Sequence, residues 1–180
     1  MKSDPAAASG WYEVGKFPDI QQGDIFFNVP IPLVPTGLYS ELKPHTTATT
    51  LTRVNVFDVV VLTQSCDLAR SEDPDRQIIL CALDDASKLY PKKSDREDVA
   101  KGRRPALHLL DKCSAAELTF AQKIVSFQTI YTVPKAYLEE LCLRSKIRVR
   151  LRSPYREHLS QAFARYFMRV GLPEPDLTVD

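Results

Sequence analysis

Apolar residues along the chain fall into short runs that are separated by charged or proline-rich segments. The branched aliphatic runs at 59–63 and 77–83 are typical of strands covered on both faces, and the charged turn at 70–76 predicts that they pair as a hairpin. Other runs rich in β-branched residues indicate further strands at 24–29, 46–55, 106–110 and 124–132. The pattern therefore predicts a protein of the α+β class that is mainly β.

Two segments towards the C-terminus show amphipathic periods. Residues 146–152 alternate charged and aliphatic side chains, which predicts a strand with one wet and one buried face. Beyond them a helix is expected, with Ser153 as its cap, Pro154 in its first turn and Gly171 at its end. Its core-facing stripe would be Tyr155, Leu159, Ala162, Phe163, Tyr166, Phe167 and Val170, and its opposite edge His158, Gln161, Arg165 and Arg169.

The segments between the strands have their own signals. Pro30, Pro32 and Pro35 predict a surface loop that runs to residue 44, because proline lacks the N–H group that a central strand needs. Residues 84–104 are mostly charged or small, which is typical of an exposed helical insertion. Residues 135–143 are expected to form a short helix after Pro134.

The composition is that of a folded globular domain. The chain has 180 residues, of which 44% are apolar and 26% charged, so it can bury a core of its own. No apolar run approaches the ~20 residues of a membrane-spanning helix, and residues 1–8 lack the apolar centre of a signal peptide. We therefore expect a cytoplasmic protein without a membrane partner.

Charge is distributed unevenly. The formal net charge is +1, yet residues 144–169 contain eight basic residues and one acid, a local net of +7, so the rest of the chain carries −6. Such a segment is either a solvated surface or a contact for an acidic protein or for RNA phosphates. The arginines expected to bind such a partner are Arg148, Arg150, Arg152, Arg156, Arg165 and Arg169.

The candidate chemistry lies where the run at 59–63 ends in polar residues. The candidate catalytic residues are Thr63, Ser65, Cys66 and Asp67. A nucleophilic cysteine needs a base, and His45, His108 and His158 are all distant in sequence.

The remaining cysteines, Cys81, Cys113 and Cys142, have apolar neighbours and are expected to be small buried hydrophobes. The chain has no Cys-x-x-Cys pair and no histidine at finger-like spacing, so we expect no metal site and no cofactor.

Three features together resemble the core of the MazF/PemK-like small β-barrels over about residues 22–83: Gly23-Asp24-Ile25 opening a strand, and the aliphatic runs at 59–63 and 78–83. The resemblance implies a small antiparallel SH3-like barrel and places Thr63 or Ser65 at a hydroxyl position of the family. The arginine that begins the family's second strand falls on residues 56–58 here, and its later threonine falls near 83–84, where this chain has other residue types.

With that barrel, the expected organisation is a loose segment at 1–15, a barrel domain at 16–152 with its insertion at 84–104, a helix at 153–172 packed on the barrel, and a tail at 173–180. The segment 153–173 resembles the end of bacterial proteins with no established activity.

Three hypotheses about function follow. The leading one is a cytosolic bacterial binding or scaffold component without catalytic activity. This hypothesis is compatible with a homodimer that forms through an edge strand. The second is a relative of ribonuclease-like toxins, which requires an arginine such as Arg53 or Arg76 near Thr63 or Ser65. The third is a cysteine-dependent enzyme, which requires a histidine within hydrogen-bond distance of Cys66.

Overall fold

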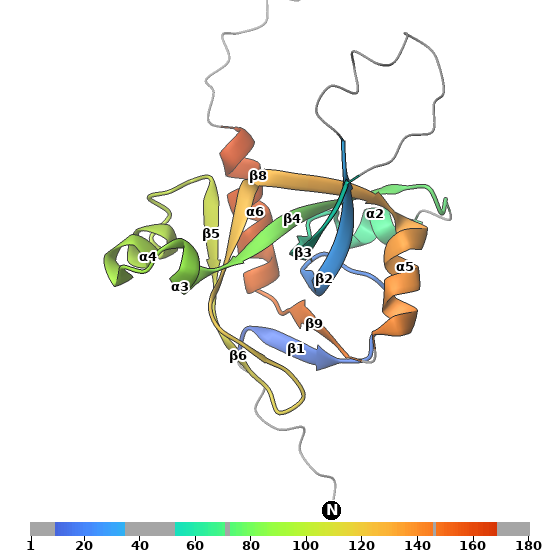
Figure 1. The fold of residues 1–180 in the computed structure, drawn as a ribbon, viewed down its shortest axis with the longest axis horizontal. Coiled ribbons are helices and arrows are strands. Elements are labelled where there is room, and N and C mark those ends of the chain that lie inside the picture. Colours follow the sequence, from blue (N-terminus) through green and yellow to red (C-terminus); the bar gives the residue numbers. More distant parts are fainter. Residues whose placement is uncertain (1–9, 35–52, 71–72, 146, 169–180) are drawn as a thin grey trace, which may run out of the picture.

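The computed structural model describes residues 10–34, 53–70, 73–145 and 147–168. Its strands form one seven-stranded antiparallel sheet in the order β1-β9-β2-β3-β4-β8-β5, and a separate hairpin of β6 and β7 (Figure 1). The strands are β1 (Tyr12–Gly15), β2 (Asp24–Leu33), β3 (Arg53–Val61), β4 (Gln77–Asp85), β5 (Leu107–Leu110), β6 (Cys113–Ser114), β7 (Thr119–Phe120), β8 (Lys123–Pro134) and β9 (Arg148–Leu151). The helices are α2 (Ser65–Arg70), α3 (Ala86–Leu89), α4 (Lys93–Ala100), α5 (Lys135–Arg144) and α6 (Tyr155–Phe167).

The α+β class with mainly antiparallel strands is confirmed, but the closed SH3-like barrel is wrong. The sheet is open, and β1 and β5 form its two edges. A barrel buries one face of its sheet in its own interior. In this sheet, helices cover both faces instead, so the strands are buried without closing on themselves.

Two apolar layers sandwich the sheet. On one face, α6 packs through Leu159 against the first layer, which contains Val60. On the other face, α2 and α5 supply Leu68 and Leu138 to a second layer, which contains Val59 (Figure 1). Val59 and Val60 are both fully buried although they point to opposite faces, which confirms the two-sided burial expected of the run at 59–63.

β3 runs without a break through residues 56–58, which the sequence left open as either a join or a continuation. The expected strands at 46–55 and 59–63 are one continuous element from Arg53 onwards, and residues 46–52 lie outside the described residues. β3 pairs with β4 in the register Val60↔Cys81, so the expected hairpin of these two strands is confirmed.

The predicted proline loop begins later than expected, because Pro30 and Pro32 lie within β2. They are cross-strand partners of Val56 and Val54 on β3. β2 pairs with β9 only at Asp24 and Ile25. The other end of β2, which contains the two prolines, therefore has β3 as its single neighbouring strand in the described sheet. Because Pro30 and Pro32 are two residues apart, their backbone nitrogens point to the same side of β2. That side can face away from β3, where no N–H donor is needed.

The N-terminal segment also differs from the prediction. Residues 12–15 form β1 rather than a loose segment, and Tyr12 is fully buried. β1 pairs antiparallel with β9, so the N-terminal strand lies beside a strand from the C-terminal part of the chain. Residues 1–9 lie outside the described residues.

Several other local predictions hold, but the expected cap of the last helix is wrong: α6 begins at Tyr155, and its N-cap is Pro154 rather than Ser153. The insertion forms α3 and α4, Pro134 ends β8, and α5 follows it directly. Four residues of the expected stripe of α6, Tyr155, Ala162, Phe163 and Tyr166, pack on the first layer. Phe167 is 56% exposed, and Arg169 and the expected end at Gly171 lie outside the described residues. None of the described helices is both long and apolar enough to cross a bilayer.

Candidate functional site

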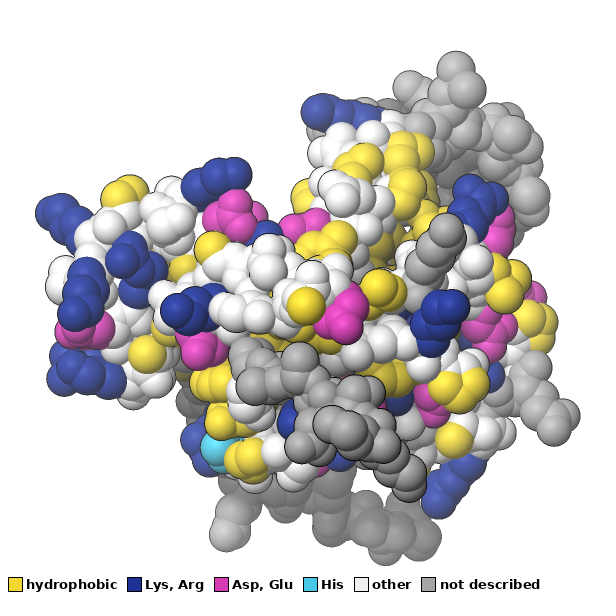
Figure 2. Space-filling model, turned by 90° about the horizontal axis from the view of Figure 1, so that it is seen from below, with side chains coloured by type: hydrophobic (Ala, Val, Ile, Leu, Met, Phe, Trp, Pro, Cys, Tyr) yellow, Lys and Arg dark blue, Asp and Glu magenta, His cyan; other side chains and the backbone are white. Residues whose placement is uncertain are grey.

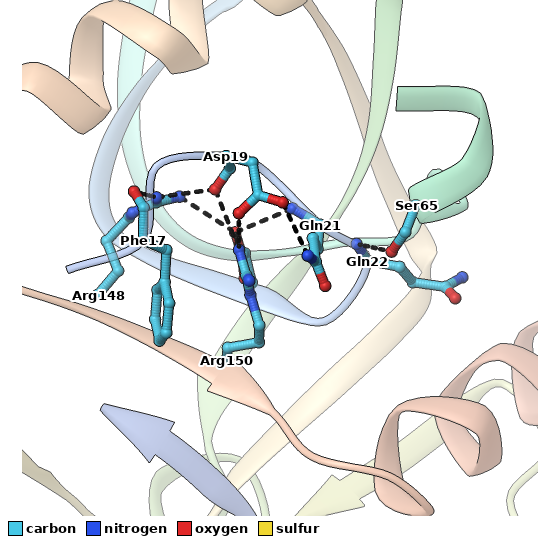
Figure 3. Close-up of polar contacts among 8 residues, drawn as sticks. Phe17, Asp19, Gln21, Gln22, Ser65, Arg148 and Arg150 are labelled. Carbon is cyan, nitrogen blue, oxygen red and sulfur yellow. Dashed lines mark hydrogen bonds and ion pairs between the residues drawn. The ribbon is translucent and has the colours of Figure 1, made fainter. Parts of the chain in front are cut away.

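The hydroxyl groups of Thr63 and Ser65 hold neighbouring backbone. The buried Thr63 Oγ1 accepts a hydrogen bond of 2.7 Å from the Ile79 N–H, next to the end of β3. Ser65 Oγ, in the first turn of α2, accepts one of 3.1 Å from the Gln22 N–H (Figure 3). These bonds join three segments that are distant in sequence, so both side chains have a clear structural role.

Cys66 and Asp67 follow in the same helix. Cys66 is exposed, and its thiol lies 3.6 Å from Gln64 Oε1 and 3.9 Å from Asp67 Oδ1. Across the described ranges, no arginine or histidine hydrogen-bonds to Thr63, Ser65 or Cys66. Of the histidines, His45 lies outside those ranges.

A hollow of about 440 Å³ opens beside Cys66, and we call it the Cys66 hollow. Its lining residues are Pro18, Asp19, Ile20, Gln21, Ser65, Cys66, Leu68, Ala69, Lys135 and Glu139. Charges of both signs line it, and Lys135 Nζ lies 3.7 Å from Glu139 Oε1. The candidates Ser65 and Cys66 therefore share one surface depression, but its charges do not select a ligand of one sign.

Behind this hollow lies a buried cluster of charges built on Asp24. The Asp24 side chain is fully buried, and its carboxylate accepts hydrogen bonds from two arginines of β9. Arg148 Nη1 donates to Oδ2 over 3.1 Å, and Arg150 Nη2 donates to Oδ2 over 3.0 Å, with a further bond from Arg150 Nε to Oδ1. Two guanidinium groups thus share one carboxylate inside the fold.

The same arginines fix the loop that lines the Cys66 hollow. Arg148 donates to the carbonyl oxygens of Phe17 and Asp19, and Arg150 donates to the carbonyl and the carboxylate of Asp19 (Figure 3). The ring centroid of Phe17 lies 4.2 Å from the Arg150 guanidinium and 5.6 Å from that of Arg148. The partial burial of Asp19 raises its pKa, but hydrogen bonds from Gln21 and Arg150 outweigh this effect and lower the pKa below its ordinary value.

The expectation that Arg148 and Arg150 face a partner is therefore wrong. They are 4% and 8% exposed, and all four residues of β9 are buried, so this strand has no wet face. The reason is Asp24, whose charge accompanies the arginines into the interior. In the sequence, Asp24 stood out only as part of the Gly23-Asp24-Ile25 motif that opens a strand, and nothing there indicated that its carboxylate is buried.

The other candidate arginines differ in availability. Arg152 is exposed, and Arg156 is half-buried and donates to the Glu157 carboxylate over 2.8 Å. Arg165 is exposed, and its hydrogen-bond partner among the described residues is the neutral Gln161 Oε1, at 3.5 Å. Arg169 lies outside the described residues.

A second hollow, of about 450 Å³, lies between α4 and α6 and is called here the α4–α6 hollow. Its lining residues are Val99, Ala100, Lys101, Gly102, Pro105, Leu107, His108, His158, Gln161, Ala162 and Arg165. His158, Gln161 and Arg165 come from the edge of α6 that the helical spacing predicted to be wet. Lys101 and His108 come from the insertion and from β5, and no pattern in the sequence indicated that they meet α6.

Basic residues dominate this part of the molecule. Lys101 and Arg165 line the α4–α6 hollow, and none of the described residues in its lining is an aspartate or glutamate. Figure 2 shows many lysine and arginine side chains gathered at the end of the molecule formed by α3 and α4, at the left of the view. Burial lowers the pKa of His108 to about 4, and the nearby His158 adds to this effect, so His108 is neutral at pH 7.

No metal centre is found within the described ranges, where no group of three or more His, Cys, Asp or Glu residues could hold an ion. The chain matches no protein-family model and no curated protein. The likeness to MazF/PemK-like barrels stays a prediction from the sequence.

Proposed function

We propose that this protein is a binding or scaffold component, without catalytic activity of its own, that contacts a polyanionic partner. The partner is an acidic protein surface or RNA. The contact centres on Lys101 and Arg165 at the α4–α6 hollow, and we call this region the basic surface.

The observation that carries the proposal is the meeting of two basic segments at one place. Arg165 belongs to the C-terminal segment with a net charge of +7, and Lys101 belongs to residues 92–104, which carry six basic and three acidic residues. Both side chains line the same hollow, and the part of its lining that the structure describes contains no carboxylate side chain. Such a concentration of positive charge attracts polyanions and speeds their association.

The state of the motif at 63–67 supports binding over catalysis. The Thr63 and Ser65 hydroxyls each accept a hydrogen bond from backbone. A nuclease built on either hydroxyl would need an arginine at the scissile phosphate. Arg53 donates to Asn55 Oδ1 at the start of β3, whereas Thr63 follows the other end of that strand.

We place this function in the cytoplasm. All four cysteines are free, including the exposed Cys66, as is usual in a reducing compartment.

The test is fluorescence anisotropy with the full-length protein and two labelled probes, a single-stranded RNA and a polyglutamate peptide. The Lys101→Gln/Arg165→Gln variant is expected to bind the preferred probe roughly tenfold more weakly than wild type at low salt, since two phosphate or carboxylate contacts are lost. The matched control, Arg53→Gln/Arg76→Gln, removes the same charge from exposed positions outside the hollow and is expected to bind like wild type.

Two outcomes would contradict the proposal. One is the absence of salt-sensitive binding to both probes, and the other is an equal loss of affinity in the control variant. Gel analysis of the RNA after incubation tests the alternative: cleavage by wild type that is lost in Arg53→Ala would favour the ribonuclease-like hypothesis.

A further inference from the structure

We infer that the α4–α6 hollow binds a small organic phosphate of nucleotide size, with the phosphate held by Lys101 and Arg165 and the organic body against the apolar wall. The inference rests on the proposed function in that these two residues belong to both. It adds a small-molecule site at the centre of the basic surface.

The size and wall of the hollow suit such a ligand. Its volume of about 450 Å³ lies in the range of ~300–1,000 Å³ that is usual for small-molecule sites. Val99, Leu107 and Ala162 supply apolar surface, and Val99 is held in the small core of the insertion. A planar or aliphatic body can therefore leave water where it lies against these side chains.

The two cations of the hollow have little compensation from carboxylates. Lys101 Nζ lies 3.9 Å from Glu97 Oε2, but both side chains are about half exposed, and such pairs are weak in water. Within the part of the chain that the structure describes, Arg165 has one polar partner, the neutral amide oxygen of Gln161. Two positive charges match a phosphate monoester, which carries about −1.5 to −2 at pH 7.

His108 adds a polar group that lacks a partner. It lines the hollow, and its Nε2 is buried without a hydrogen bond in the described structure. Leaving a buried polar atom unpaired is unfavourable. A ligand hydroxyl or phosphate oxygen that reaches this nitrogen would supply the missing hydrogen bond.

The test is isothermal titration calorimetry of the full-length protein with adenosine 5′-monophosphate, adenosine and inorganic phosphate. The monophosphate is expected to bind at least tenfold more tightly than either fragment. Lys101→Gln/Arg165→Gln is expected to weaken the monophosphate at least tenfold, and Arg103→Gln, an exposed neighbour outside the lining, to leave it unchanged.

Filling the hollow separates this site from the basic surface. Ala162→Leu and Ala100→Leu add bulk to the lining without changing charge, and Ala164→Leu adds the same bulk at an exposed position of α6 outside it. The first two variants are expected to lose the monophosphate and keep polyanion binding, and the third to keep both. Because Ala100 is exposed, its variant tests the site even where the substitution at the half-buried Ala162 unfolds the protein, which a thermal melt would reveal.

The outcomes separate the two claims. A protein that binds the anisotropy probe but not the monophosphate at millimolar concentration overturns the phosphate site alone. Equal affinity for adenosine and the monophosphate, or for inorganic phosphate and the monophosphate, overturns the stated ligand class. Monophosphate binding that needs Lys101 and Arg165, without polyanion binding, supports the site and counts against the proposed function.

Discussion

At the scale of single residues, Asp24 holds more of the backbone around the Cys66 hollow in place than any residue of the polar motif at 63–67. Its carboxylate holds Arg148 and Arg150, whose remaining N–H groups bind the carbonyl oxygens of the loop at 16–23. Gln22, in that loop, then donates to Ser65. A chain of hydrogen bonds therefore runs from a buried carboxylate to the first turn of α2.

Asp24→Asn should destabilise the fold strongly, because it removes the buried counter-charge of Arg148 and Arg150 and leaves Arg150 with the half-exposed carboxylate of Asp19. The expected loss in the free energy of unfolding is about 3–5 kcal/mol, measured by urea denaturation. Asp19→Asn is the control, since the Asp19 side chain is 51% exposed and its loss is expected to cost less than about 1 kcal/mol. Equal losses in the two variants would show that Asp24 has no special role.

His108 gives the fold a defined pH dependence. Its pKa is about 4 in the folded protein, against an ordinary value of 6.5, because burial disfavours the imidazolium. Between these values the unfolded chain binds more protons than the folded one, so stability rises with pH. The contribution is complete above pH 6.5, falls as the pH drops towards 4, and amounts to at most about 3 kcal/mol.

Urea denaturation from pH 4 to pH 7.5 measures this effect. His108→Phe keeps an aromatic ring beside Phe127 and is expected to flatten the curve in that window, whereas His158→Gln on the exposed edge is expected to leave it steep. A His108→Phe curve as steep as that of wild type would assign the pH dependence to other groups.

At the scale of elements, the sequence predicts best where local signals agree with burial. Pro134 marks the boundary between β8 and α5, and the charged insertion forms helices. The alternating pattern of β9 predicted one exposed face, but all four residues of the strand are buried. The pattern cannot distinguish an arginine that pairs with a buried carboxylate from one that faces water. The missing information was the position of Asp24, which is distant in sequence and reaches β9 only through the pairing of β2 with β9.

α5 offers a matched pair for testing its packing. Leu138 is fully buried against the second apolar layer, and Leu143, in the same helix, is 89% exposed. Leu138→Ala is expected to lower the free energy of unfolding by about 2–5 kcal/mol, since it removes buried surface and leaves a cavity. Leu143→Ala is expected to change it by less than about 0.5 kcal/mol. Similar values for both would mean that α5 does not pack on the sheet as described.

At the scale of the whole molecule, the open sheet decides where the functional residues meet. The insertion leads into β5 at one edge of the sheet, and residues of the insertion, β5 and the C-terminal helix line one hollow there. The wet edge of α6 could be predicted from helical spacing, but the approach of Lys101 to Arg165 could not, since it depends on strand order. The resemblance to a small barrel predicted antiparallel strands correctly but also implied a closed sheet. The described sheet is open, because its edge strands β1 and β5 pair with β9 and β8 and not with each other.

The salt dependence of RNA binding tests the central claim most directly, because it counts the charges that meet phosphates. The slope of log K against log salt concentration is expected to be smaller in magnitude for Lys101→Gln/Arg165→Gln than for wild type by about 1.4, given ~0.7 per contact on single strands. The slope of Arg53→Gln/Arg76→Gln should equal that of wild type. Identical slopes for all three proteins would contradict the assignment of the basic surface to Lys101 and Arg165.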